Sequence, residues 1–198
     1  MKIVKELNNE ILNEIKYILD NDGLIIFPTD TVYGIGCNCF SKKAIKKLFI
    51  NKNRSSNKPI NVLTNSKEKI NLVARNINIK EQDLINKYLP GDMTIILDKK
   101  DNVPNILTAN LDTIGVRIPN NDIALKILEI YPYPLATTSV NISGLSPGIE
   151  VNDFLDEFKD KVDIIIDGGK SKIGVASTIV RVDNNKIKIL RQGNLKVE

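Results

Sequence analysis

The chain has 198 residues, with 28 Lys and Arg against 24 Asp and Glu and a net charge of +4. This length fits one domain that buries roughly 70% of its unfolded surface, and the mild positive charge suits a phosphate-bearing ligand better than a long polynucleotide. The sequence has no His and two Cys, which excludes imidazole bases, Ser-His-Asp and Cys-His catalysis and a four-ligand zinc site.

No apolar run approaches the length of a membrane span, and the first ten residues lack the apolar segment of a signal peptide. We therefore expect a soluble cytoplasmic protein with no membrane contact. Cys37 and Cys39 are two residues apart, and a disulfide between them is not expected.

Hydrophobic periodicity predicts helices and strands that interleave along the chain. Helices are predicted over 9–20, after the cap residue Ser41, after the cap residue Ser66, over 80–89, from Asn121 or Asp122 to 130, and over 151–158. Strands are predicted over 24–27, 60–64, 93–97, 113–118, 135–139, 162–166, 177–182 and 186–190. The order is not strictly alternating and shows no repeat, so we expect an α/β fold in one domain: a twisted mixed β-sheet flanked by helices.

The segment FPTDTVYGIG, residues 27–36, follows the buried strand expected at 24–27. Pro28 has no N–H to donate and ends that strand. The polar side chains of Thr29, Asp30, Thr31 and Tyr33 come next, before a turn expected at the Gly-x-Gly of residues 34–36. Loops at strand ends carry function disproportionately, so we interpret this segment as a pocket wall rather than as a plain connection.

A polar loop expected over 51–59 contains Lys52, Arg54 and Lys58. In an extended loop, Lys52 and Arg54 can face the same side and present an ammonium and a planar guanidinium together. This pair suits a polyphosphate, because Lys acts as a point charge and Arg as a bidentate donor. A solvated loop is the alternative, and these two residues alone favour it.

Further polar residues lie at the ends of predicted strands. Ser139 and Asn141 follow an apolar strand and offer a hydroxyl and an amide to an adenine edge or a phosphate, although an Asx-type turn fits them equally well. Ser177 begins one strand and Arg191 ends the next, so both can line one rim. Arg117 lies in the apolar segment GVRIP and requires an anionic partner.

Taken in order, seven motifs resemble those of the threonylcarbamoyl-AMP synthases of the YrdC-like superfamily. They are PTDTVYGIG, Lys52-x-Arg54 with Lys58-Pro59, Pro90-Gly91, Val116-Arg117, Ser139-x-Asn141-x-Ser143-Gly144, Ser177-Thr178 and Leu190-Arg191-x-Gly193. They extend from about Leu24 to Gly193, and the chain resembles the single-domain form. Ser55 and Asp92 stand where the family usually has Pro, and Val140 stands where Ala is common.

The resemblance implies a YrdC-like sheet with a basic groove and a reaction of L-threonine, bicarbonate or CO₂, and ATP. The products are threonylcarbamoyl-AMP and pyrophosphate, and partner enzymes pass the threonylcarbamoyl group to the adenosine beside a tRNA anticodon. Catalytic roles are implied for Lys52 and Arg54. The residues expected to contact the nucleotide are Lys52, Arg54, Lys58, Ser139, Asn141 and Arg191, and those expected to contact threonine are Thr29, Thr31, Tyr33, Arg117 and Ser177.

The missing His is consistent with this chemistry. Threonine and bicarbonate would give an N-carboxylate, which is already an anionic nucleophile and needs little base catalysis. Positioning and charge neutralisation would supply most of the rate. ATP is the expected nucleotide, and Mg²⁺ is expected to arrive with ATP rather than on dedicated protein ligands.

Two alternatives stay open from the sequence. An RNA-binding module of the same fold would need clustered basic residues and aromatic stacking platforms. The chain has no Trp and is 5% aromatic, so direct RNA binding is expected to be weak or absent. The second alternative is a related enzyme that forms another carbamoyl adenylate, because few residues define the acceptor pocket.

Overall fold

The computed structural model describes residues 1–142 and 144–198. Its strands are β1 Lys2–Val4, β2 Ile25–Phe27, β3 Gly34–Asn38, β4 Asn61–Leu63, β5 Ala74–Arg75, β6 Met93–Lys99, β7 Thr113–Arg117, β8 Leu135–Ser139, β9 Ile164–Ile166, β10 Thr178–Asp183 and β11 Lys186–Arg191. Its helices are α1 Asn9–Asp20, α2 Lys42–Asn51, α3 Lys67–Ile70, α4 Ile79–Tyr88, α5 Asp122–Ile130 and α6 Leu155–Phe158, with a 3-10 turn η1 at Val151–Asp153.

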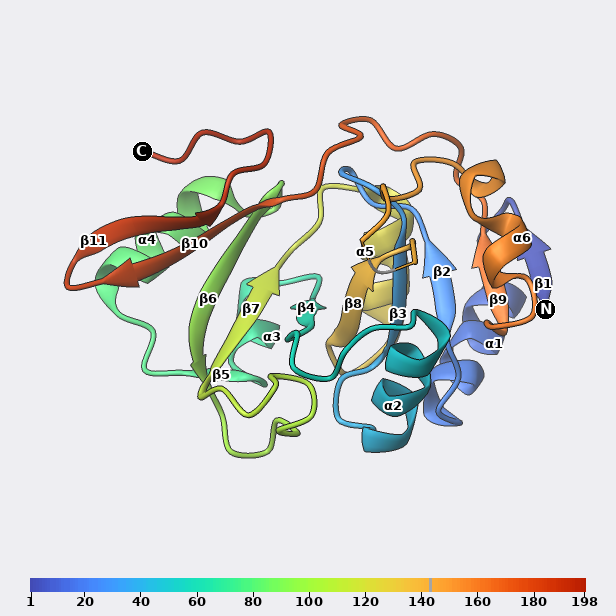
Figure 1. The fold of residues 1–198 in the computed structure, drawn as a ribbon, viewed down its shortest axis with the longest axis horizontal. Helices are drawn as coiled ribbons and strands as arrows, with labels where there is room; N and C mark the ends of the chain where they lie inside the picture. Colours follow the sequence, from blue (N-terminus) through green and yellow to red (C-terminus); the bar gives the residue numbers. More distant parts are fainter. Residues whose placement is uncertain (143) are drawn as a thin grey trace.

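The strands form one twisted sheet in the order β1-β9-β2-β3-β8-β4-β7-β6-β10-β11, with β5 paired to β6 beside this path (Figure 1). The sheet combines parallel and antiparallel pairs: β4 is parallel to β7 but antiparallel to β8, and β6 is parallel to β10 but antiparallel to β7. The predicted α/β class, a twisted mixed sheet flanked by helices, is therefore confirmed. Among the described residues, no helix combines the length and the apolar character needed to cross a bilayer.

Helices cover both faces of the sheet, with α2 in front of it and α5 behind it in the view of Figure 1. Along β2, Ile25 and Phe27 belong to the hydrophobic cluster that includes α1 and α5, whereas Ile26 belongs to the cluster that includes α2, α4 and α6. The neighbouring strand β9 divides its Ile side chains between the same two clusters. Burial on both faces explains why these strands are continuous apolar runs in the sequence.

The predicted helix starts are confirmed by their capping contacts. The hydroxyl of Ser41 accepts a hydrogen bond from the backbone N–H of Ala44 at 3.0 Å, which caps α2. Ser66 caps α3 in the same way, and the Asn121 side chain caps α5. These side chains satisfy backbone N–H groups that have no partner inside the helix, as their sequence positions predicted.

The Gly-x-Gly of residues 34–36 was predicted as a turn, and this prediction is wrong, because these residues begin a strand. This strand is β3, which pairs antiparallel with β2 on one side and with β8 on the other. Its glycines serve close packing: a Cβ on Gly34 would lie 2.8 Å from Thr137 Cγ2, and a Cβ on Gly36 would lie 3.0 Å from Phe27 Cε1. The short strands β1 and β5 were also not predicted.

Candidate active site

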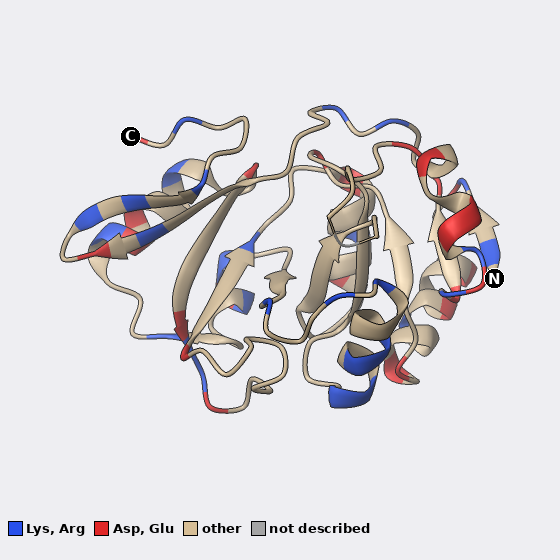
Figure 2. Ribbon diagram, viewed as in Figure 1, with Lys and Arg blue, Asp and Glu red and all other residues tan. Residues whose placement is uncertain are grey.

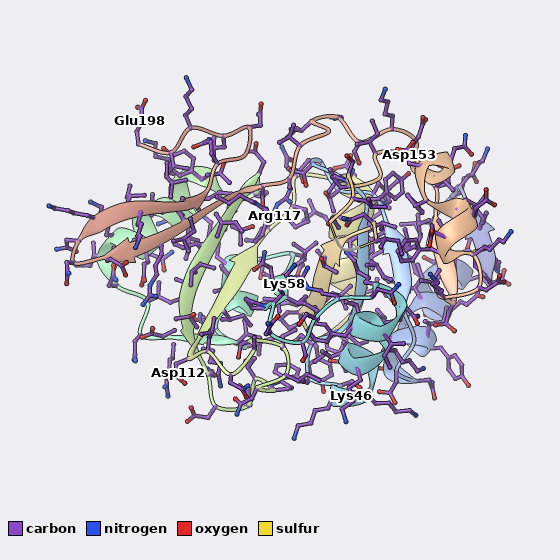
Figure 3. All side chains as sticks on the ribbon, in the orientation of Figure 1. Lys46, Lys58, Asp112, Arg117, Asp153 and Glu198 are labelled. Carbon is purple, nitrogen blue, oxygen red and sulfur yellow. The ribbon has the colours of Figure 1, made fainter. Side chains whose placement is uncertain are left out.

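A cavity of about 470 Å³ lies where the sheet twists between its two halves. Strands β6, β7, β10 and β11 contribute one part of its wall, strands β3, β4 and β8 another, and the loops at 29–33, 54–60 and 176–177 complete it. Figure 3 labels Arg117 and Lys58 in this central region. Within the described part of the chain, the lining includes Arg54, Lys58, Arg117 and Arg191 but no Asp or Glu, so the expected basic groove is present.

The loop after β2 presents Thr29 and Thr31 to the cavity. Both residues are buried, and their hydroxyl oxygens lie 2.9 Å apart. Thr29 also donates to the backbone carbonyl of Val32 at 2.7 Å, so its hydroxyl closes the loop on itself. This local bond explains why the chain turns sharply between β2 and β3.

Arg117 finds its anionic partner in Asp30, which lies in the loop 29–33 after β2, named the threonine loop from here on. Its Nη2 lies 2.5 Å from Asp30 Oδ1, and the two side chains are 7% and 6% exposed. Its Nη1 donates to Thr31 Oγ1 at 2.7 Å, and its Nε donates to the carbonyl of Gly91 at 2.8 Å. Burial lowers the pKa of Arg117, and the charge of Asp30 opposes this effect. Through these contacts Arg117 holds the threonine loop against the end of β7.

Lys52 lies in a different place from the one predicted. It ends α2 with a helical backbone, and the chain turns only at Asn53, whose φ is 48°. The side chain is 1% exposed and runs behind the end of β8 rather than along the cavity wall. The interpretation of Lys52 and Arg54 as neighbours on one side of an extended loop was therefore wrong.

The ammonium of Lys52 is held by uncharged groups. It donates to Thr138 Oγ1 at 3.3 Å, to Asn141 Oδ1 at 3.1 Å and to the carbonyl oxygen of Ser139. No carboxylate of the residues that the structure describes lies within 4.0 Å of it. Burial, followed by the nearby charge of Arg54, lowers the pKa of Lys52 from 10.5 to about 7.

Arg54 and Lys58 do reach the cavity from the loop after α2. Arg54 is half-buried and donates through Nη2 to the carbonyl of Pro59 at 2.8 Å. Its Nε also donates to the carbonyl of Lys58 at 3.4 Å, and these two contacts leave most of the guanidinium N–H groups available to a ligand. Lys58 is exposed at the mouth, so for these two residues the structure favours a cavity wall over a plain solvated loop.

Ser139, at the end of β8, and Asn141, in the turn that follows, differ in whether they line the cavity. Ser139 lines the cavity and donates to Asn141 Oδ1 at 2.7 Å. Asn141 lies behind it, where its amide donates to the carbonyl of Leu145 at 2.7 Å and so forms a turn. Ser143, part of the same predicted motif, lies outside the described residues.

Ser177 and Arg191 share one rim of the cavity, as their strand positions predicted. Arg191 Nη2 donates to the carbonyl of Ser177 at 2.8 Å and to its hydroxyl at 3.2 Å. The Ser177 hydroxyl lies 2.8 Å from that of Thr94 on β6. Thr94 was missed in the sequence, because a Thr inside an apolar strand indicates β-propensity before it indicates a site, and Thr137, which also lines the cavity, was missed for the same reason. Asn61 lines the cavity too and was not predicted as a site residue.

Tyr33 lines the cavity, but its hydroxyl is used within the protein. The hydroxyl donates to the carbonyl of Gly169 at 2.7 Å and accepts from the N–H of Gly168 at 3.1 Å. Burial raises the pKa of Tyr33 to about 12, so the phenol stays protonated. No cluster of three or more Cys, Asp or Glu side chains suited to a metal ion occurs among residues 1–142 and 144–198.

The comparison with known families gives one match, the Sua5/YciO/YrdC family described as "Telomere recombination", over residues 17–193. A threonylcarbamoyl-AMP synthase of Pyrococcus abyssi is 37% identical over 175 residues, which are 88% of this chain and 52% of that protein. A putative threonylcarbamoyl-AMP synthase of Methanocaldococcus jannaschii is 38% identical over 203 residues, which are 100% of this chain and 95% of that protein. The chain thus spans about half of the first relative and nearly all of the second.

Solved structures show the same fold. The crystal structure of P. abyssi Sua5 complexed with L-threonine has a TM-score of 0.92 and 34% identity, covering 98% of this chain and 57% of that chain. The crystal structure of Escherichia coli YciO has a TM-score of 0.87 at 24% identity and covers 100% of this chain and 96% of that chain, which is a likeness of fold alone. The predicted YrdC-like sheet is confirmed.

Proposed function

Because the chain belongs to the Sua5/YciO/YrdC family, we propose that it is an L-threonylcarbamoyladenylate synthase that acts as one catalytic domain over residues 1–198. It would join L-threonine, bicarbonate or CO₂, and ATP into threonylcarbamoyl-AMP and release pyrophosphate. The observation that carries the proposal is the cavity itself, in which basic side chains and hydroxyl groups line one space free of Asp and Glu among the described residues. The names of the P. abyssi and M. jannaschii relatives support the same reaction.

The reaction needs little acid–base chemistry from the protein. The amine of threonine adds to the carbon of bicarbonate with loss of water, which gives an N-carboxylate. An oxygen of this carboxylate attacks the α-phosphorus of ATP, the bond from that phosphorus to the bridging oxygen breaks, and pyrophosphate leaves. The N-carboxylate is already anionic, so a protein without His can supply the remaining requirements, which are orientation and charge neutralisation.

Cations from two parts of the cavity wall support a phosphate site. Arg54 and Lys58 approach from the loop after α2, and Arg191 approaches from the opposite rim. Ser139 offers a hydroxyl at the strand end between them, whereas Lys52 and Asn141 would act on the nucleotide through that strand end. Mg²⁺ would be bound by the phosphates of ATP, because no described carboxylate lines the cavity.

The hydroxyl-rich end of the cavity suits L-threonine. Thr29, Thr31, Tyr33, Arg117 and Ser177 all contribute to it. The description of the P. abyssi structure as a complex with L-threonine supports this assignment for a relative at 34% identity. The product would then serve the enzymes that transfer a threonylcarbamoyl group to tRNA.

The test measures pyrophosphate release with each substrate omitted in turn. Release is expected only with L-threonine, bicarbonate and ATP together. Serine should be used less well than threonine, and valine hardly at all, because a pocket that pairs a substrate hydroxyl rejects the isostere without it by up to ~10⁴-fold. Release without bicarbonate, or equal rates with threonine and valine, would instead favour a different adenylate-forming reaction.

A further inference from the structure

The direction of one hydrogen bond in the threonine loop is fixed by a short oxygen–oxygen distance. The hydroxyl oxygen of Thr29 lies 2.7 Å from the carbonyl oxygen of Val32. Two oxygens this close require a hydrogen between them, and a carbonyl has none, so the only hydroxyl hydrogen of Thr29 points at Val32. The backbone N–H groups of Thr31 and Val32 lie farther away, at 3.2 and 3.3 Å from the same hydroxyl oxygen, and share one of its two lone pairs, which leaves the other lone pair for a second donor.

Two neighbours then fix the hydrogen-bonding role of the Thr31 hydroxyl. Its oxygen lies 2.9 Å from that of Thr29, and the hydrogen between the two must belong to Thr31, because the hydrogen of Thr29 is already used. On the other side, Arg117 Nη1 donates to Thr31 Oγ1 at 2.7 Å. A hydroxyl has one hydrogen and two lone pairs, so one lone pair of Thr31 is left for a ligand.

The order of donors cannot reverse, because the series begins at a guanidinium. Arg117 has donors and no acceptor. Its orientation is set by Asp30 at 2.5 Å and by the Gly91 carbonyl at 2.8 Å, and both charged side chains are buried. The series therefore runs in one direction, from Arg117 to Thr31, from Thr31 to Thr29, and from Thr29 to the Val32 carbonyl.

We propose that this hydroxyl relay holds Thr31 as a fixed hydrogen-bond acceptor in the cavity, and that the relay selects substrates carrying a donor, such as a hydroxyl, at that point. Thr29 is then a positioning residue that acts through Thr31. Which substrate hydroxyl is selected rests on the proposed function, where it is the side-chain hydroxyl of L-threonine. The relay itself rests on the distances within the loop.

The test compares threonine and valine as substrates in Thr29→Val and Thr29→Ser, with pyrophosphate release as the readout. In Thr29→Val the hydrogen of Thr31 loses its acceptor and is free to turn into the cavity. The threonine-to-valine ratio of kcat/KM should fall by about tenfold, the factor that one hydrogen bond typically contributes. The KM for ATP should stay within about twofold, because Thr29 is not among the residues proposed to contact the nucleotide, and Thr29→Ser should restore the ratio.

The double variant Thr29→Val/Thr31→Val separates positioning from direct contact. If Thr29 acts only through Thr31, the double variant has the same threonine-to-valine ratio as Thr31→Val alone. Additive losses, an unchanged ratio in Thr29→Val, or equal losses with both amino acids would overturn the relay. If Thr29→Val does not fold, Thr29→Ala leaves the same hydrogen without an acceptor and replaces it. Wild-type protein without threonine-dependent release would overturn the proposed function, and this inference with it.

Discussion

The burial of Lys52 predicts that the protein becomes more stable as the pH rises from 6 to 9. Folding lowers the pKa of this ammonium from 10.5 to about 7, because it is buried among uncharged oxygens. Between these two values the unfolded chain binds a proton that the folded chain does not. Stability rises with pH wherever the unfolded state binds more protons, so the penalty is complete below pH 7 and disappears above about pH 10.5.

The size of the effect follows from the two pKa values. Their gap corresponds to about 5 kcal/mol of destabilisation when Lys52 is protonated in both states. Between pH 6 and pH 9, the same two values give a gain of roughly 2–3 kcal/mol in the free energy of unfolding. The chain has no His, the side chain that most often titrates in this window, so the contribution of Lys52 stands out.

Urea denaturation at several pH values between 6 and 9 measures this gain in wild type, Lys52→Met and Lys58→Met. Lys58 is the matched control, because it is an exposed Lys in the loop that follows α2. Wild type and Lys58→Met should share the rise, and Lys52→Met should lack it, since all other groups are common to the three proteins. Because Lys52→Met also removes a hydrogen-bond donor from Asn141 Oδ1, it should be less stable than wild type at pH 9. The test is therefore the slope of the unfolding free energy against pH and not its value at one pH. Equal slopes in wild type and Lys52→Met would refute the reasoning.

Three further predictions concern the cavity, the sheet and RNA. Arg54→Ala should reduce pyrophosphate release by ~10²-fold and change the free energy of unfolding by less than about 0.5 kcal/mol, because it removes a charge from a loop; wild-type turnover would contradict a phosphate role. Gly34→Ala should lower the unfolding free energy by about 1–3 kcal/mol, since its Cβ would lie 2.8 Å from Thr137 Cγ2; an unchanged denaturation midpoint would contradict this packing. Binding to tRNA, measured against salt, should fade near physiological ionic strength, because Lys and Arg are spread over several elements rather than joined in one stripe (Figure 2); tight binding at that salt would favour the RNA-binding alternative.

Much of the site could be predicted because most of its residues share one property: they are polar and lie where an apolar strand ends. Thr31, Ser139, Ser177 and Arg191 were predicted from their positions at strand ends, Arg54 was predicted from its polar loop, and all of them line one cavity. Their proximity depends on strand pairings between distant segments, such as β4 with β7 and β8. No local pattern specifies such pairings, so the sequence indicated which residues belong together without indicating how the sheet joins them.

Lys52 and the glycines of β3 show where local interpretation fails. The end of α2 has no Gly or Pro to mark it, because Asn53 adopts the left-handed conformation in their place, and so the helical backbone of Lys52 was predicted as extended. Gly34 and Gly36 indicated a turn, since glycine is most common there. Their actual reason for being glycine is the closeness of Thr137 and Phe27, one of them about a hundred residues away in sequence.

The arginines of the cavity divide into two kinds, and the division follows from their partners. Arg117 is paired with a buried carboxylate, so removing it would leave Asp30 charged and unpaired in the interior, which typically costs about 3–5 kcal/mol of stability. Arg54 donates to two backbone carbonyls, and its charge is not neutralised by any described carboxylate within 4.0 Å. The sequence distinguishes their surroundings, an apolar strand for Arg117 and a polar loop for Arg54, but it does not show their partners. The structure assigns Arg117 to holding the threonine loop and leaves the charge of Arg54 for an anionic ligand.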